Sequence, residues 1–279
     1  MIKILKRLKL DNLFNFNILK KDKPVINNIT ESKKAHCLIC GKFTFFDSAE
    51  PLDNPCKRNS FYCRHCHSIS RNRHIAKIIL EKFPTKPKSR SLKDFSKKNE
   101  IKILNTCASG PIHEYLKDNK NYFVSEYFED VKPGEYFNGI QCQNLEKTTF
   151  KNNMFDLIIT EDIFEHISDP QKACIEIRRI LKNGGYHIST ISVFWNLSKS
   201  VKRAQTKEIG QIEYFLPPIY HGDPNRKDGI LVFTDFGSDI VKEYLSFTGK
   251  TEVFWSNGNV EDQKKYAIYN NMVFISKKD

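Results

Sequence analysis

Short apolar segments alternate with helix-like segments from Ile101 to the end of the chain, and this alternation constrains the fold most. Such a pattern is typical of a parallel sheet that is covered by helices. The helical periodicity is clearest at 170–181, where the glycines Gly184 and Gly185 follow as a helix exit. We therefore expect an α/β, Rossmann-like sheet of seven mostly parallel strands. Five are predicted at 101–106, 122–125, 139–142, 155–160 and 186–191, with a hairpin-like pair at 251–255 and 272–276.

Two cysteine pairs precede this region and are spaced for a metal ion. Cys37-x2-Cys40 and Cys63-x2-Cys66 are separated by 22 residues, which is close to the double C-x2-C pattern of zinc ribbons. Four thiolates at about 2.3 Å would close the tetrahedral shell of a Zn²⁺ ion and leave no position for a substrate water. We therefore predict a structural zinc ion on these four cysteines.

The N-terminal part of the chain is also distinguished by its charge. Residues 1–100 hold 23 Lys and Arg against 9 Asp and Glu, whereas residues 101–279 hold 22 against 24. Excess positive charge suits nucleic acid, an anionic membrane or an anionic substrate, but solvated lysine-rich surface has the same composition. Arg64, Arg71 and Arg73, beside the second cysteine pair, are interpreted as solvated, with phosphate binding as the alternative.

Composition and spacing together suggest four segments. Residues 1–35 are a basic lead whose first 21 residues could contact a membrane peripherally, but they lack the continuous apolar region of a secretory signal. A zinc ribbon with a following helix is expected at 36–83, a linker rich in Pro, Lys and Ser at 84–100, and the sheet domain at 101–279, with an insertion at 195–233. No apolar stretch is long enough to cross a membrane, and eight cysteines without an export signal suit a reducing compartment, so we expect a cytoplasmic protein.

The first turn of the sheet domain limits which ligand can bind there. In open α/β sheets a ligand binds beyond the carboxyl ends of the strands. The loop 105–111 consists of small residues with a single glycine, and the absence of G-x-G-x-x-G weighs against a nicotinamide or flavin dehydrogenase. Glu126 ends the second strand, where a carboxylate can accept hydrogen bonds from both hydroxyls of a ribose.

Two segments resemble a known family. Phe155–Ile167 (FDLIITEDIFEHI) and Arg179–Gly185 (RILKNGG) resemble the signature of class I S-adenosylmethionine-dependent methyltransferases of the type 11 group. Ser125–Phe128, Tyr220–Pro224 and Thr234–Gly237 are similar to a subgroup that carries an N-terminal zinc ribbon and that includes members associated with glycan assembly. The resemblance implies a class I methyltransferase fold and S-adenosyl-L-methionine as the cofactor. The candidate cofactor-binding residues are Asn105, Cys107, Ser109, Gly110, Glu126, Tyr127, Asn144, Thr160, Glu161 and Asp162.

Methyl transfer is an in-line attack on a sulfonium methyl group, so the enzyme mainly aligns the acceptor and needs a base only if the acceptor loses a proton. The candidate catalytic bases are His166 and His221. We expect O-methylation of a small-molecule or glycan acceptor, bound near the insertion. Two alternatives are a nucleic-acid methyltransferase whose basic ribbon binds phosphates, and a scaffold without cofactor, because the first loop lacks the acidic residue and the several glycines usual in the family.

Overall fold

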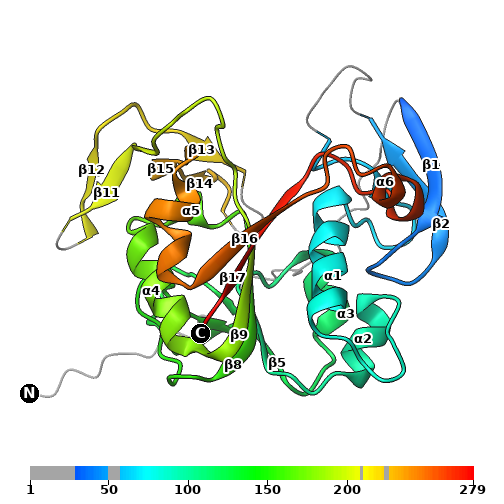
Figure 1. The fold of residues 1–279 in the computed structure, drawn as a ribbon. Coiled ribbons are helices and arrows are strands. Elements are labelled where there is room, and N and C mark those ends of the chain that lie inside the picture. Colours follow the sequence, from blue (N-terminus) through cyan, green and yellow to red (C-terminus); the bar gives the residue numbers. More distant parts are fainter. Residues whose placement is uncertain (1–28, 50–56, 208–209, 223–225) are drawn as a thin grey trace, which may run out of the picture.

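The computed structural model describes residues 29–49, 57–207, 210–222 and 226–279, so the predicted membrane contact of residues 1–21 lies outside it. Its centre is an eight-stranded sheet in the order β16-β17-β9-β8-β4-β5-β7-β6 (Figure 1). The strands are β4 (Ile103–Asn105), β5 (Tyr122–Glu126), β6 (Tyr136–Phe137), β7 (Ile140–Cys142), β8 (Phe155–Glu161), β9 (Leu181–Thr190), β16 (Lys250–Trp255) and β17 (Met272–Lys277).

The directions of these strands confirm the predicted Rossmann-like sheet. β4 runs parallel to both β5 and β8, β5 to β7, and β8 to β9. β17 is antiparallel to β9 and to β16, as expected for the hairpin-like pair. All seven expected strands are present, and the two-residue strand β6 adds an eighth at one edge.

Helices cover both faces of the sheet, because each offers an apolar stripe (Figure 1). α1 (Ser70–Lys82), α2 (Leu92–Lys98) and α3 (Gly110–Leu116) lie on one side, and α4 (Pro170–Ile180) and α5 (Ile240–Glu243) lie on the other. In α4, Ala173, Ile177 and Ile180 are fully buried, and the Asp169 carboxylate accepts a hydrogen bond from the Lys172 amide at the helix start. A 3-10 turn, η1 (Phe164–His166), follows β8 at the carboxyl end of the sheet.

The cysteine-rich segment is a small antiparallel sheet of β1 (Glu31–His36), β2 (Phe43–Ser48) and β3 (Tyr62–Cys63). Its buried side chains share one hydrophobic core with α1, α2 and the adjacent face of the central sheet. The expected linker at 84–100 is wrong in one respect, because it contains α2, whose Leu92 and Phe95 are fully buried in this core. The ribbon therefore packs on the sheet domain through an apolar contact.

The insertion at 195–233 forms short two-stranded pairs on the α4 and α5 side of the sheet (Figure 1). They are β10 (Val201–Lys202) with β15 (Thr234–Asp235), β11 (Ala204–Thr206) with β12 (Ile212–Tyr214), and β13 (Tyr220–His221) with β14 (Ile230–Leu231). The Phe233 amide donates to the Glu165 carbonyl oxygen at 2.7 Å, which attaches the insertion to η1. Within the described ranges, no helix has both the length and the apolar character that a membrane crossing requires.

Candidate active site and metal centres

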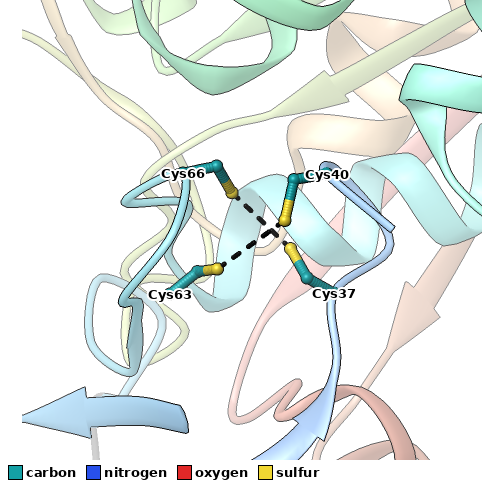
Figure 2. A group of neighbouring side chains, drawn as sticks. All are labelled: Cys37, Cys40, Cys63 and Cys66. Atoms are coloured by element: carbon teal, nitrogen blue, oxygen red, sulfur yellow. Dashed lines mark hydrogen bonds between the residues drawn. The ribbon is translucent and has the colours of Figure 1, made fainter. Parts of the chain in front are cut away.

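The four predicted cysteines converge on one point of the ribbon (Figure 2). The Cys37 and Cys66 sulfurs are 3.6 Å apart, and the Cys40 and Cys63 sulfurs are 3.9 Å apart. Sulfurs at the corners of a tetrahedron with bonds of about 2.3 Å to zinc lie about 3.8 Å from one another. The cluster therefore has the size and the donor set that a Zn²⁺ ion requires.

Two equivalent turns position these sulfurs. The Gly41 amide donates to the Cys37 carbonyl oxygen at 2.9 Å, and the His67 amide donates to that of Cys63 at 2.8 Å. Gly41 and His67 each follow the second cysteine of a pair and adopt left-handed conformations, with φ of +75° and +58°. The local backbone thus repeats, and each pair contributes half of the cluster.

A buried cation lies beside the cluster. The Arg73 guanidinium donates to the backbone oxygens of Tyr266 at 2.9 Å and Ala267 at 2.6 Å, and it also contacts Ser68. Burial lowers the pKa of Arg73 to about 10, while the nearby thiols favour its charged form. A zinc ion with four thiolates carries a net negative charge, which Arg73 would offset. Its interpretation as a solvated side chain is therefore wrong.

The first loop of the sheet domain contacts the predicted ribose-binding carboxylate. The Ala108 amide donates to Glu126 Oε1 at 2.8 Å, so the loop after β4 and the end of β5 meet at the carboxyl edge of the sheet. Gly110 has φ of +83°, and a Cβ atom there would meet nothing within 4 Å. The loop is thus held in place by Glu126 and has open space in front of Gly110.

Cys107 lies in the same loop and is kept in its thiol form. Burial raises its pKa to about 12, and the negative charges of Glu126 and Glu161 act in the same direction. Asn105 holds the loop through two hydrogen bonds. Its side-chain amide donates to the Tyr122 hydroxyl and to the Cys107 carbonyl oxygen, both at 3.0 Å. This environment suits a packing and positioning role for Cys107 rather than nucleophilic attack.

The end of β8 is bound by side chains from the ribbon and from α1. Arg58 donates to both carboxylate oxygens of Asp162, at 3.1 and 2.7 Å, and Arg71 also contacts this carboxylate. The Asn72 amide donates to Glu161 at 2.7 Å. Asp162 has φ of +49°, a conformation that Asp tolerates better than most residues, and the two guanidiniums hold it there. Burial raises the pKa of Glu161, an effect that Arg71 and Asn72 partly offset.

Buried polar atoms without a hydrogen-bond partner concentrate near this edge of the sheet. Among the described side chains, they include Asn105 Oδ1, Arg71 Nε and Glu165 Oε2, together with the Ser189 and Thr190 hydroxyls at the end of β9. Such atoms are rare in folded proteins and commonly mark positions that water or a ligand satisfies. These residues therefore fit a polar ligand such as S-adenosyl-L-methionine at the ends of β4, β5 and β8.

Three predicted cofactor residues contact other groups of the protein. The Asn144 side chain accepts a hydrogen bond from the Glu146 amide at 2.8 Å and so braces a turn. Thr160 is buried within the sheet, where its hydroxyl bonds to His187 at 2.9 Å. The Tyr127 side chain is 47% exposed, and its carbonyl oxygen accepts from Arg226. Ser109, by contrast, precedes α3 within the first loop and contacts Cys107.

The two predicted bases are neighbours. The rings of His166 and His221 are nearly perpendicular, with centroids 5.0 Å apart, although 54 residues separate them in sequence. Glu165 joins them, since its carboxylate and one nitrogen of each ring lie within 4.8 Å of one another. Burial raises the pKa of Glu165, and Arg58 lowers it to a smaller extent.

Sequence reasoning missed four residues of this region: Glu165, Arg58, Arg71 and Asn72. Glu165 was visible beside His166 in the segment FEHI, but a carboxylate at a helix start is ordinarily a surface group. Arg71 was interpreted as solvated, which is wrong, because its partner Asp162 is 91 positions away. Arg64 is closer to the expectation, since it is half exposed and pairs with Asp47.

Known proteins match part of the chain. A family model described as a methyltransferase domain matches residues 107–189, a stretch that includes the first loop, Glu126 and the end of β8. An uncharacterized protein of Methanocaldococcus jannaschii is 33% identical over 95 residues, which are 34% of this chain and 42% of that protein. The chain thus spans about two fifths of the curated relative that it matches.

Solved structures match part of the chain with low sequence identity and low TM-scores. An S-adenosylmethionine-dependent methyltransferase of Mesorhizobium loti is 12% identical, with a TM-score of 0.38 over 63% of this chain and 90% of that chain. The PH0226 protein of Pyrococcus horikoshii is 14% identical, with a TM-score of 0.40 over 65% and 83%. The match of residues 107–189 to a methyltransferase-domain model and the mostly parallel sheet both agree with the resemblance seen in the sequence.

Proposed function

We propose that this protein transfers a methyl group from S-adenosyl-L-methionine to a hydroxyl of a small-molecule or glycan acceptor. The observation that carries the proposal is the contact between the Ala108 amide and Glu126, which fixes a carboxylate at the carboxyl edge of the sheet. A carboxylate at the end of the second strand is the group that accepts hydrogen bonds from ribose hydroxyls in nucleotide-binding α/β folds. The matched family stretch includes both residues.

The cofactor would supply an electrophilic methyl group on a sulfonium sulfur. Glu126 would orient the ribose, and the small side chains of the loop 107–110 would let the backbone approach the ligand. Transfer of this methyl group to the acceptor oxygen would leave the electron pair of the broken bond on the sulfur and would release the hydroxyl proton. His166 or His221, which lie together next to the end of β8, would take the hydroxyl proton.

The environment of the arginines favours a hydroxyl acceptor over nucleic acid. Arg73 is fully buried against backbone oxygens, and Arg58 and Arg71 are bound to Asp162 inside the protein. These side chains are therefore unavailable to bind a phosphate backbone, which needs exposed cations. The insertion instead presents aromatic side chains near His221, including Tyr214, Phe215 and Tyr220, and aromatic surface suits the apolar faces of sugars and small molecules.

We also propose that the four cysteines bind a structural Zn²⁺ ion. The sulfur spacing and the two matching turns support it. A closed shell of four thiolates leaves no open position, so this ion would stabilise the ribbon and take no part in the reaction.

Calorimetry with S-adenosyl-L-methionine and with its demethylated product tests cofactor binding. We expect both to bind wild-type protein, and Glu126→Gln to weaken both by at least about tenfold, which is about 1.4 kcal/mol. Glu114→Gln is the matched control, because Glu114 is an exposed carboxylate whose partner is Lys117 on the same helix. Absence of heat with the wild type, or equal affinity in Glu126→Gln, would contradict the cofactor assignment and favour the scaffold alternative.

A product screen tests the acceptor. Purified protein and methyl-labelled cofactor are incubated with cell extracts, which are then separated into small-molecule, glycan, protein and nucleic-acid fractions. We expect the label in a hydroxyl-bearing small molecule or glycan, as an ether that is stable to mild base. Label found only in protein or nucleic acid would overturn the acceptor class while leaving the methyltransferase assignment intact.

A further inference from the structure

Glu165, His166 and His221 form a second group of metal-type donors at the carboxyl end of the sheet. One carboxylate oxygen and one nitrogen from each ring lie within 4.8 Å of one another. Donors at about 2.1 Å from one tetrahedral ion lie about 3.4 Å from one another, so these atoms would move closer together on binding. Two imidazoles and one carboxylate form a donor set that binds divalent transition metals and leaves open positions for other ligands.

His166 is oriented by a hydrogen bond on the ring nitrogen that would face away from the ion, as metal-ligating histidines generally are. His166 Nδ1 lies 2.8 Å from the Leu231 carbonyl oxygen, so this nitrogen carries the proton and Nε2 presents a lone pair. Leu231 belongs to β14, which pairs with β13, and the paired strands also carry His221. The same hairpin therefore fixes the tautomer of one histidine and supplies the other.

Glu165 is a buried carboxyl group that Ser192 and its own backbone amide hydrogen-bond in part. The residue is only 2% exposed, and its Oε2 atom has no hydrogen-bond partner among the described residues. Burial of an ionised carboxylate is costly unless a cation or several donors accompany it. The nearest guanidiniums are those of Arg58 and Arg71, and both are bound to Asp162. A cation shared with the two histidines would compensate this carboxylate.

We propose that Glu165, His166 and His221 bind a divalent transition-metal ion at the carboxyl end of the sheet. The nitrogen donors favour Zn²⁺, Co²⁺, Fe²⁺ or Mn²⁺ over Mg²⁺ and Ca²⁺, which prefer oxygen ligands. Because His221 is exposed, the open positions of this ion face solvent on the insertion side, where the acceptor is expected. Binding of the ion is independent of the proposed function, but a role for the ion in the reaction rests on that function. The ion would polarise the acceptor hydroxyl and make its proton easier to remove, and when both rings bind the ion this proton would pass to solvent instead of to His166 or His221.

Titration of Co²⁺ into full-length protein that holds one equivalent of zinc, confirmed by metal analysis, tests this site. Cobalt bound by thiolates has a strong charge-transfer band that cobalt bound by nitrogen and oxygen lacks, so absorption separates the two centres. We expect one added equivalent of Co²⁺ without the thiolate band, and at least about tenfold weaker binding in His221→Ala and in Glu165→Gln. Glu213→Gln is the control, since this exposed carboxylate of the insertion pairs with Lys207 and lies outside the group.

Each outcome decides the proposal. It is overturned if wild-type protein takes up no cobalt beyond the ribbon, if the thiolate band accompanies the uptake, or if His221→Ala binds cobalt as tightly as the wild type. His221 is exposed, so its variant folds even if the buried Glu165→Gln does not, and circular dichroism verifies both. Calorimetry with S-adenosyl-L-methionine on the same samples separates the proposals: cofactor binding without cobalt binding rejects only the metal site, and the reverse rejects only the methyltransferase function.

Discussion

The molecule has two groups of metal-type side chains, and they differ in nearly every physical respect. The four cysteines of the ribbon are largely buried, lie at tetrahedral spacing and are surrounded by turns that repeat each other. Glu165, His166 and His221 range from buried to exposed and come from η1 and from the inserted β13–β14 pair. A closed, symmetric shell suits a structural ion, whereas an open, asymmetric one suits exchange of ligands. By this difference the proposed ion on Glu165, His166 and His221, unlike one on the four cysteines, would be open to a substrate.

The two regions are nevertheless connected. Arg58 precedes β3 and Arg71 lies in the first turn of α1, so both belong to the ribbon and its following helix. They bind Asp162, which is three residues before Glu165. The ribbon thus holds the end of β8 in place, and we expect damage to the ribbon to reach the proposed active site.

The largest effect is expected from replacing one of the four cysteines of the ribbon. Cys63→Ser should abolish zinc retention and destabilise the protein by several kcal/mol, because binding of a structural zinc ion is coupled to folding. Thermal unfolding and metal analysis would measure this. Cys174→Ser is the control: Cys174 is also fully buried but lies in α4, outside the cluster, so it should retain zinc and lose only about 1 to 2 kcal/mol. Equal destabilisation by the two variants would remove the distinction between ligand and packing cysteines.

A smaller effect is expected from cutting the connection between the regions. Asp162→Asn keeps the side-chain shape and tolerates the positive φ but leaves Arg58 and Arg71 without their carboxylate, so we expect a loss of about 2 kcal/mol in the free energy of unfolding. Denaturant unfolding of this variant, of Arg58→Met and of the double variant gives the coupling energy. Arg64→Met is the control, because Arg64 also lies in the ribbon but pairs with Asp47, so its effect should simply add to that of Asp162→Asn. Coupling near zero would mean that Asp162 does not hold the ribbon to the sheet.

Much of this arrangement was predictable from the sequence, because local sequence patterns indicate the strands, the cysteine cluster and the position of Glu126. The apolar alternation located seven strands, the cysteine spacing located the ribbon cluster, and the position of Glu126 at a strand end located it beside the first loop. Each of these features is set by residues close together in the chain.

The remainder depends on contacts between distant segments. Arg73 is buried because the backbone oxygens of Tyr266 and Ala267 accept its protons, and nothing near position 73 indicates this. Leu92 and Phe95 lie in the segment predicted as a linker, but the ribbon and α1 assemble the core that buries them. His166 and His221 were each predicted singly, whereas their proximity depends on how the inserted β13–β14 pair folds back over η1.

The smallest effect is expected from replacing His187, a histidine of the sheet core that lies outside the group of Glu165, His166 and His221. His187 is fully buried and bonds to Thr160, and burial lowers its pKa to about 3. The folded protein therefore keeps this ring neutral, and the stability it contributes is complete above the unfolded pKa of about 6.5 and is lost as the pH falls toward 3. The slope approaches about 1.4 kcal/mol per pH unit, which gives a loss of about 1 kcal/mol between pH 6.5 and 5.5. Denaturant unfolding at several pH values should show a shallower loss in His187→Gln than in the wild type. Because the other titratable groups are the same in both proteins, their contributions cancel in the difference. If His187→Gln and the wild type lost stability equally on acidification, the His187 ring would gain its proton in the folded state as easily as in the unfolded state. Burial would then not lower its pKa.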